Sequence, residues 1–351
     1  MNLKERMIVE DYRKNRDDFV EIGEIVNNKL HEIVEQSNVK AFAIEYRVKK
    51  EKSLIGKLHR SDGYYNQFSD LLDILGARVI CYFSDEVDVV GKEIEKAFII
   101  DKENSSDKRA LIQADSFGYV SLHYICSLKK SDAYDERLCQ WRFEIQIRTA
   151  LQHIWSDIEH DMGYKNEFGV PRAVIRGFSR NAGLLEIADD EFVRIRDNMK
   201  SYTENIRQHI INNTADDISI DMISLSEYMK SNIKMQEFLH ELASFSDAQI
   251  DFNDPDNYIE QLKWFNITKI GQLQDLLKSY KQSALEMAKN ALTNSDLDII
   301  SSNAGLLYLC RAKLIHEYTQ EQAISFLMIS LKDEQRAQRS VKYIYRYKDK
   351  I

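Results

Sequence analysis

The chain has 351 residues, of which 44% are hydrophobic and 30% are charged, a composition typical of a folded protein with two or three domains. Its formal net charge of -9 argues against a global attraction to nucleic acids or anionic membranes, although it leaves room for a local basic patch. The chain starts with charged residues rather than an apolar signal-peptide core, and it has no run of about 18 apolar residues. Its four cysteines form no CxxC pair, as expected of buried free thiols. These features predict a cytoplasmic protein with no membrane partner.

The first 165 residues alternate between helical and extended patterns. Apolar residues recur at helical spacing in residues 3–37, 50–60, 84–98 and 150–162. Extended patterns occupy residues 41–49, 77–83, 118–128 and 140–149. This order predicts an α+β domain with a mixed β-sheet and flanking helices. In the last helix, the apolar spacing predicts a core-facing side made of Leu151, Ile154, Trp155, Ile158 and Met162.

The pattern changes after Pro171. From there to residue 351 the chain consists of amphipathic helices separated by polar breaks, with no convincing strand and no chemical motif. We therefore divide the chain into three parts. They are a helix that packs on the following domain (1–40), the α+β domain (41–170) and an all-helical region (171–351).

Basic residues cluster between residues 41 and 60. Arg47 and Lys49 share one face of the expected strand, and Ser53, Lys57 and Arg60 share one face of the helix that follows. Several cations and a hydroxyl near a helix N-terminus suit a triphosphate. The alternative is a solvated basic helix face, since the chain has no glycine-rich phosphate loop.

Asp73 and Arg78 flank the start of the strand expected at residues 77–83. A carboxylate at a strand edge suits Mg²⁺, which takes one or two carboxylates together with phosphate oxygens. The planar guanidinium of Arg78 suits stacking on a nucleobase. A surface ion pair is the alternative.

Two later strands each present a polar face. Tyr119 and His123 share one face of the strand at residues 118–128, as expected either of a base-stacking row or of an ordinary edge strand. In the strand at residues 140–149, Glu144, Gln146 and Arg148 alternate with apolar residues. A carboxylate, an amide and a guanidinium together indicate a functional face.

Five stretches in this order resemble the synthetase domain of the RelA/SpoT alarmone family, particularly its small single-domain members. They read YRVKKEKSLIGKL, DLLDILGARVI, GYVSLHY, FEIQIRTALQHIW and IEHDMGYK, and they cover roughly residues 40–165. The resemblance implies a nucleotidyltransferase-like fold. It also implies the transfer of the β,γ-diphosphate of ATP to the 3′-hydroxyl of GTP or GDP, which gives (p)ppGpp and AMP.

The resemblance also implies a role for each matching residue. Asp73 and Glu144 would coordinate Mg²⁺, and Glu144 would also take the proton from the attacking hydroxyl. The implied ATP-binding residues are Arg47 and Arg78 at the adenine and Lys49, Ser53, Lys57 and Arg60 at the phosphates. The implied acceptor-binding residues are Tyr119, His123, Gln146, Arg148 and His153. The pocket is expected to be shaped by Glu159, His160, Tyr164 and Lys165.

One departure from the family pattern leaves the acceptor open. Many small synthetases carry a Lys or Arg shortly before the Gly-Tyr pair, whereas this chain has Asp115 there. Toxic relatives use adenine nucleotides or the 3′ end of tRNA, so both stay alternatives to GTP and GDP. A non-catalytic nucleotide sensor is a third alternative, against which the presence of Asp73 and Glu144 argues.

Two further expectations concern the regions outside the resemblance. Only about 40 residues precede the matching segment, too few for the helical hydrolase domain of long family members, so we expect synthesis without hydrolysis. The helical region is expected to regulate the α+β domain or to form a homo-oligomer, and its sequence does not choose between these roles.

Overall fold

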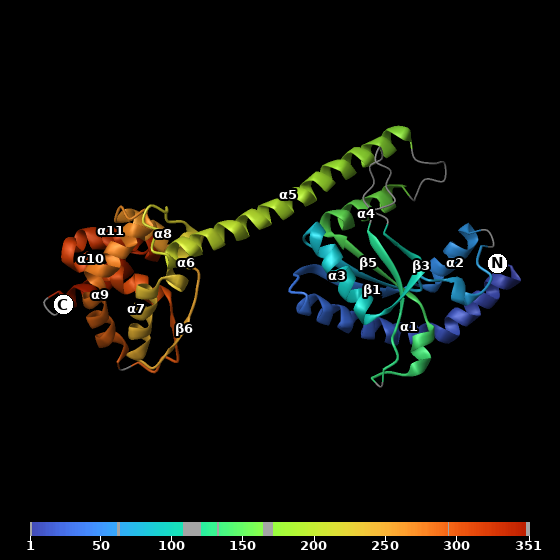
Figure 1. Ribbon diagram of the computed structural model, residues 1–351, viewed down its shortest axis with the longest axis horizontal. Helices are drawn as coiled ribbons and strands as arrows, with labels where there is room; N and C mark the ends of the chain where they lie inside the picture. Colours follow the sequence, from blue (N-terminus) through green and yellow to red (C-terminus); the bar gives the residue numbers. More distant parts are fainter. Residues whose placement is uncertain are drawn as a thin grey trace. The chain divides into compact units, whose positions relative to one another are not determined.

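The computed structural model describes residues 2–61, 64–107, 121–131, 133–163, 171–293 and 295–348. The chain packs into two compact units, residues 1–196 (unit 1) and residues 197–351 (unit 2), which are both drawn in Figure 1. The division falls inside the 40-residue helix α5 (Arg172–Ile211). Each unit has its own hydrophobic core.

Unit 1 is built on a five-stranded sheet. Its strands are β1 (Ala41–Val48), β2 (Leu75–Cys81), β3 (Ile99–Asp107), β4 (Leu122–Ser127) and β5 (Phe143–Thr149). Their order is β1-β2-β5-β4-β3, with β2 and β5 parallel and the other neighbours antiparallel. The predicted mixed sheet is confirmed. β3 is an addition, because its sequence IIDKENSSD lacks the regular alternation that marks a strand.

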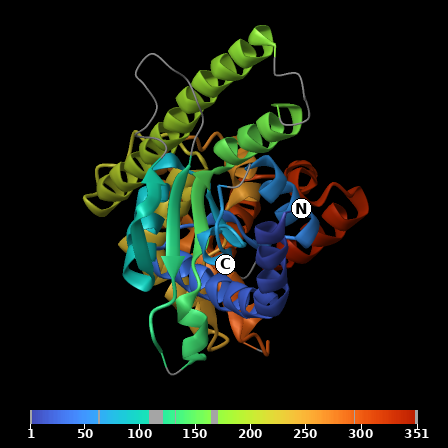
Figure 2. The ribbon, with the colours of Figure 1, turned by 90° about the vertical axis from the view of Figure 1, so that its right-hand side faces the viewer.

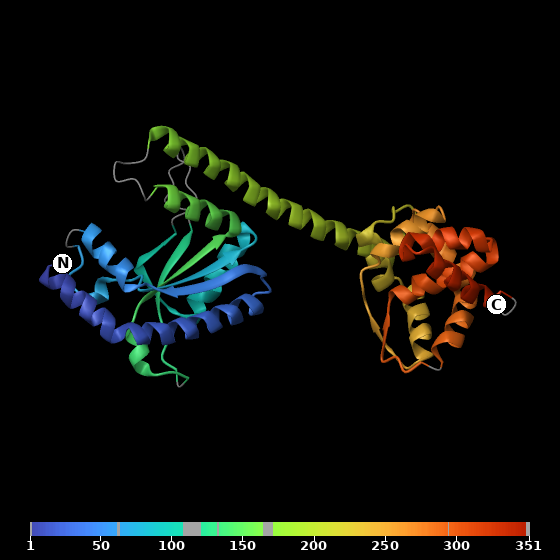
Figure 3. The same ribbon diagram turned by 180° about the vertical axis from the view of Figure 1, so that it is seen from behind.

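Helices cover both faces of this sheet. They are α1 (Leu3–Gln36), α2 (Glu51–Arg60), α3 (Ser84–Ala97) and α4 (Ala150–Gly163), with short 3₁₀ turns η1 (Phe68–Asp70) and η2 (Glu136–Gln140) between elements. Figures 1, 2 and 3 show from three directions that α1 and α4 lie on opposite sides of the strands. The apolar core lies on the side of α1 and α3.

The two faces of the sheet differ in chemistry because side chains alternate along each strand. In β5, Phe143, Ile145 and Ile147 are fully buried in the core shared with α1 and α3. Glu144 and Gln146 point to the other face. That face carries the polar side chains of the site.

Helix α1 is joined to the start of α2 by a hydrogen bond and an ion pair. The hydroxyl of Tyr12 donates a 2.6 Å hydrogen bond to the backbone carbonyl of Lys49, and Arg13 pairs with Glu51 at 2.5 Å. Tyr12 is itself buried in the unit 1 core. The helix therefore fixes the position of the chain between β1 and α2.

The predicted orientation of α4 is wrong for three of the five residues expected to face the core. Ile154, Ile158 and Met162 are 52%, 48% and 56% exposed instead of buried. The helix instead turns Gln152 and His153 toward the sheet, and they are 8% and 17% exposed. The physical reason is that α4 covers the polar face of the sheet, so its inward side must also be polar.

Unit 2 confirms the predicted helical region. Beyond the last part of α5 (residues 197–211) it contains α6 (Met222–Ser231), α7 (Ile233–Ser244), α8 (Asp256–Trp264), α9 (Ile270–Leu292), α10 (Asn303–Glu317), α11 (Gln320–Leu331), α12 (Glu334–Ile344) and the turn η3 (Tyr345–Tyr347). It also contains two parallel strands that the sequence does not predict, β6 (Gln249–Asp251) and β7 (Ile299–Ser301), each too short to show a pattern. No helix in the described part of the chain combines the length and apolar character that crossing a bilayer requires.

Candidate active site

The strand register places two rows of polar side chains across the sheet. Arg47 pairs with Gly76, and Gly76 pairs with Glu144, while the next row joins Arg78 to Gln146. Paired residues point to the same side of a sheet, so these side chains share the face opposite the core. A Cβ on Gly76 would meet nothing within 4 Å. The glycine therefore leaves the space above the sheet unfilled between Arg47 and Glu144.

Asp73 lies in the turn before β2, where two lysines hold its carboxylate. Lys49 Nζ is 2.6 Å from Oδ2, and Lys57 Nζ is 2.8 Å from Oδ1. Lys49 follows β1 and Lys57 lies on α2. Lys57 Nζ also lies 5.2 Å from the centre of the Tyr65 ring, within cation–π range.

The ion pairs set the charge of this group of residues. Burial alone would raise the pKa of Asp73, but the hydrogen bonds and charges of Lys49 and Lys57 outweigh burial and hold this pKa below its ordinary value. Burial, together with the charges of Lys57 and Arg47, lowers the pKa of Lys49 despite the opposing effect of Asp73. For Lys57, Asp73 and Tyr65 outweigh burial, so its pKa is raised. Asp73 is therefore ionised at neutral pH.

Glu144 is held by two hydrogen-bond donors. His123 Nδ1 lies 2.7 Å from Oε1, and Gln146 Nε2 donates to Oε2 at 2.9 Å. Ser121 Oγ lies 2.7 Å from the other ring nitrogen of His123, so the histidine is itself fixed in orientation. Burial alone would raise the pKa of Glu144, but the bonds from His123 and Gln146 outweigh it, so this pKa is lowered. Glu144 is also a carboxylate at neutral pH.

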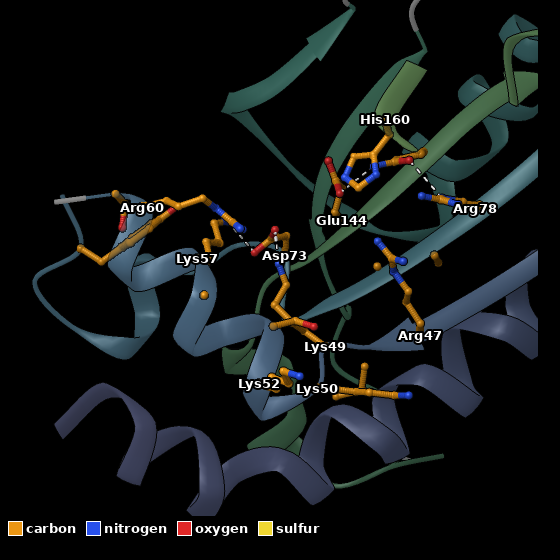
Figure 4. Close-up of a pocket in the computed structure, with 18 residues that line it drawn as sticks. Arg47, Lys49, Lys50, Lys52, Lys57, Arg60, Asp73, Arg78, Glu144 and His160 are labelled. Atoms are coloured by element: carbon orange, nitrogen blue, oxygen red, sulfur yellow. Dashed lines mark hydrogen bonds and ion pairs between the residues drawn. The ribbon is translucent and has the colours of Figure 1, made fainter. Parts of the chain in front are cut away.

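Asp73 and Glu144 both line one cavity of about 900 Å³. Its described lining has seven Lys or Arg side chains against these two carboxylates, namely Arg47, Lys49, Lys50, Lys52, Lys57, Arg60 and Arg78. In Figure 4, Lys49 and Lys57 converge on Asp73. The negative charge of Asp73 opposes the lowering of the pKa of Glu144, and both carboxylates border this cavity. The excess of cations suits a polyphosphate ligand.

The family match covers this cavity. Residues 46–168 match the family model described as "Region found in RelA / SpoT proteins". The chain carries a RelA/SpoT-family domain. The resemblance inferred from the five sequence stretches is thereby confirmed.

Two relatives of the RelA/SpoT domain come from Bacillus subtilis (strain 168). GTP pyrophosphokinase YjbM is 28% identical over 153 residues, which cover 43% of this chain and 69% of the relative. GTP pyrophosphokinase YwaC is 29% identical over 156 residues, which cover 43% of this chain and 71% of the relative. The crystal structure of the small alarmone synthetase 1 from Bacillus subtilis aligns with a TM-score of 0.45 and 22% identity, over 55% of this chain and 99% of that chain.

The RelA/SpoT domain brings together all the residues that the sequence assigns to ATP and to the metal ion. Each of them lines the cavity, Ser53 and Arg60 on α2 included. Their individual roles stay predictions.

The predicted acceptor residues are placed less uniformly. Gln146 lines the cavity, whereas His123 reaches it through its bond to Glu144. Arg148 and His153 do not line the cavity. Tyr119 lies outside the described residues, as do Tyr164, Lys165 and Asp115.

Arg148 does not reach the cavity itself but contacts Gln146, which lines it. It is 3% exposed, and one of its terminal nitrogens donates to Gln146 Oε1 at 3.1 Å. The same oxygen accepts from Arg78 Nε at 3.3 Å, so one amide joins both guanidinium groups. Burial and the nearby charge of Arg78 lower the pKa of Arg148 to about 10, and burial also lowers the pKa of His153. Arg148 therefore positions Gln146 and Arg78.

Some lining residues have no role in the sequence prediction. Tyr65 lies beneath Lys57, and Lys50 and Lys52 add positive charge at the start of α2. The two lysines belong to the basic cluster that the sequence shows, but Tyr65 carries no such signal. His160, expected to shape the pocket, does line it.

We predict that Arg148→Met raises the melting temperature by about 1–4 °C while slowing the reaction. Arg148 is a buried cation whose Nε has no hydrogen-bond partner, and apolar replacement of buried charges is often neutral or stabilising. Thermal unfolding followed by circular dichroism measures the effect. Arg148→Lys, which keeps the charge, is the control and is expected to bring no gain. A methionine variant that melts well below the wild type would contradict this prediction.

Proposed function

We propose that the RelA/SpoT domain is a GTP diphosphokinase, which transfers the β,γ-diphosphate of ATP to the 3′-hydroxyl of GTP or GDP. The observation that carries the proposal is the single cavity in which Asp73 and Glu144 face seven cationic side chains. The names of the two relatives, both GTP pyrophosphokinases, support it. The products would be AMP and (p)ppGpp.

The cationic side chains supply binding and alignment. Diphosphate transfer asks a protein mainly to place two polyanions in line and to neutralise their charge. Lys49, Ser53, Lys57 and Arg60 line the same cavity, where they would form one phosphate-binding surface. Arg47 and Arg78 lie on neighbouring strands, where their flat guanidinium groups suit the two faces of the adenine.

Glu144 would receive the proton of the acceptor hydroxyl. Its carboxylate is ionised, lines the cavity and is held in orientation by His123 and Gln146. The acceptor hydroxyl would lose its proton to Glu144 as its oxygen attacks the β-phosphorus of ATP. Fixing the base before the substrate arrives reduces the reorganisation that the reaction needs.

Asp73 and Glu144 also fit a magnesium ion. Both present carboxylate oxygens, the ligands that Mg²⁺ prefers, and both are ionised. Their present partners, two lysines for Asp73 and His123 and Gln146 for Glu144, are side chains able to give way to a cation. When bound, Mg²⁺ would neutralise phosphate charge and lower the pKa of the acceptor hydroxyl.

A transfer assay tests the proposal. We expect label from γ-labelled ATP to appear on GDP or GTP when the purified full chain is given separate samples of GDP, GTP, GMP, ATP and tRNA. A labelled adenine nucleotide with a 3′-diphosphate, or labelled tRNA, would instead identify the alternative acceptors. No transfer to any of the five would indicate a nucleotide sensor. Thin-layer chromatography resolves the nucleotide products, and gel electrophoresis resolves labelled tRNA.

The proposal is limited to synthesis. Incubating purified (p)ppGpp with the chain and Mn²⁺ tests this limit, and release of diphosphate would contradict it.

A further inference from the structure

The end of unit 2 concentrates positive charge in an otherwise acidic chain. Residues 335–348 contain five cations, three tyrosines and no acidic residue, whereas the whole chain has a net charge of -9. The five cations are Arg336, Arg339, Lys342, Arg346 and Lys348. All of them are exposed. We call these residues, together with Tyr343 and Tyr347, the α12 surface.

The helix α12 is fixed on the unit 2 core by its apolar side. Ala337, Val341 and Ile344 are at most 1% exposed, so the opposite side faces solvent. Arg336, Arg339 and Tyr343 follow one another at i, i+3 and i+7 and therefore share that side. A cationic ridge with an aromatic ring results.

The cations of the α12 surface are available to a ligand. In the described part of unit 2, ion pairs engage Arg207, Lys269, Lys281 and Lys313, and none engages a cation of the α12 surface. An unpaired exposed guanidinium can exchange its water for a phosphate oxygen without breaking an internal bond.

The tyrosines give the surface a second property. The rings of Tyr343 and Tyr347 lie 5.7 Å apart and their hydroxyl oxygens are 3.1 Å apart. The bond with Tyr343, together with burial, raises the pKa of Tyr347 to about 12, so the hydroxyl of Tyr347 stays protonated at neutral pH. Between them, the hydroxyl of Tyr345 donates to the backbone carbonyls of Leu314 and Tyr318 and fixes the segment. Tyr343 is 42% exposed and offers its ring to a flat partner.

We propose that the α12 surface binds a single-stranded nucleic acid. Arginines along one helix side match the phosphates of a strand, and exposed rings stack on unpaired bases. An anionic membrane fits less well, because the apolar side of α12 is buried and cannot insert into lipid. An acidic peptide would use the cations but would leave the tyrosines without a role.

Fluorescence anisotropy of the full chain with labelled 12-nucleotide oligouridylate and oligothymidylate, over a series of NaCl concentrations, tests this proposal. Each phosphate contact to a single strand contributes about 0.7 to the slope of log K against log salt concentration. The triple variant Arg336→Ala, Arg339→Ala, Arg346→Ala is therefore expected to bind at least tenfold more weakly and to lose about 2 from that slope. Preference for one oligonucleotide identifies the strand as RNA or DNA.

A matched variant removes the same charge elsewhere in unit 2. Lys234→Ala, Lys278→Ala, Lys289→Ala changes three exposed lysines and is expected to leave affinity and slope unchanged.

Tyr343→Ala is expected to weaken binding at least fivefold with the slope unchanged, and Tyr343→Phe is expected to restore the affinity. Equal losses in the two triple variants would overturn the proposal. So would binding that none of these changes weakens, or equal affinity for polyglutamate or for phosphatidylserine vesicles. Glu144→Gln is expected to leave this binding intact, so failure here is separable from failure of the transfer assay.

Discussion

Replacing Glu144 with glutamine is expected to slow diphosphate transfer at least about 100-fold, because a positioned general base typically contributes 10²–10⁴-fold. Glutamine keeps the size of the side chain and its bond to His123, but it cannot accept the proton, and its neutral amide holds a cation less strongly. The initial rate of transfer from γ-labelled ATP measures the loss. The KM for ATP is expected to change little.

The matched control is Glu103→Gln, the same substitution at an exposed position on β3. It is expected to keep full activity. The pH profile adds a separate check. Because the pKa of Glu144 lies below its ordinary value of 4.5, its ionisation should produce no loss of rate between about pH 8 and pH 6. Near-full transfer by Glu144→Gln would remove this residue from the mechanism.

Replacing Asp73 with asparagine is expected to lower kcat at least about 100-fold without raising the KM for ATP. The substitution removes one of the two carboxylates proposed to hold Mg²⁺. It also releases Lys49 and Lys57 from their partner, and freed lysines hold phosphate at least as well. Steady-state kinetics separates the two constants. A raised KM with an unchanged kcat would show that Asp73 serves binding alone.

The same variant is expected to be less stable by about 1 kcal/mol at neutral pH, because two partly buried lysines lose their counter-charge. The folded-state pKa of Asp73 is lowered, so its stabilising effect is present above the ordinary aspartate value of 3.8 and is lost as pH falls through the lowered value. Urea unfolding at pH 7 and near pH 3 should show this difference shrink in acid. Asp70→Asn, three residues earlier and outside the cavity lining, is the control for activity.

The sequence predicts the clustering of the cationic cavity residues well, because these residues lie close together in the chain. Arg47 and Lys49 are two residues apart on an extended segment, and Lys57 and Arg60 are three apart on a helix, so simple periodicity places each pair on one face. The presence of Asp73 and Glu144 at one cavity is different. It depends on the parallel pairing of β2 with β5, which no local pattern specifies. Only the family resemblance implies a shared site for the two residues.

Other features escape the sequence for physical reasons. The apolar stripe of α4 predicts a buried side, but a helix that covers a polar sheet face must turn polar residues inward. Alternation correctly puts Arg148 on the face of Glu144 and Gln146, yet its burial depends on what covers that end of the strand. Tyr65 follows α2 in a segment without periodicity, so nothing marks its place beneath Lys57.

The contact between α1 and the chain after β1 sets the smallest fragment worth expressing. The family match begins at residue 46, yet Tyr12 holds the backbone of Lys49, and Arg13 holds the first turn of α2. Trimming the protein to the matched segment would remove a scaffold that lies more than thirty positions upstream of the lysines it supports. A fragment meant to keep the cavity intact therefore has to include α1.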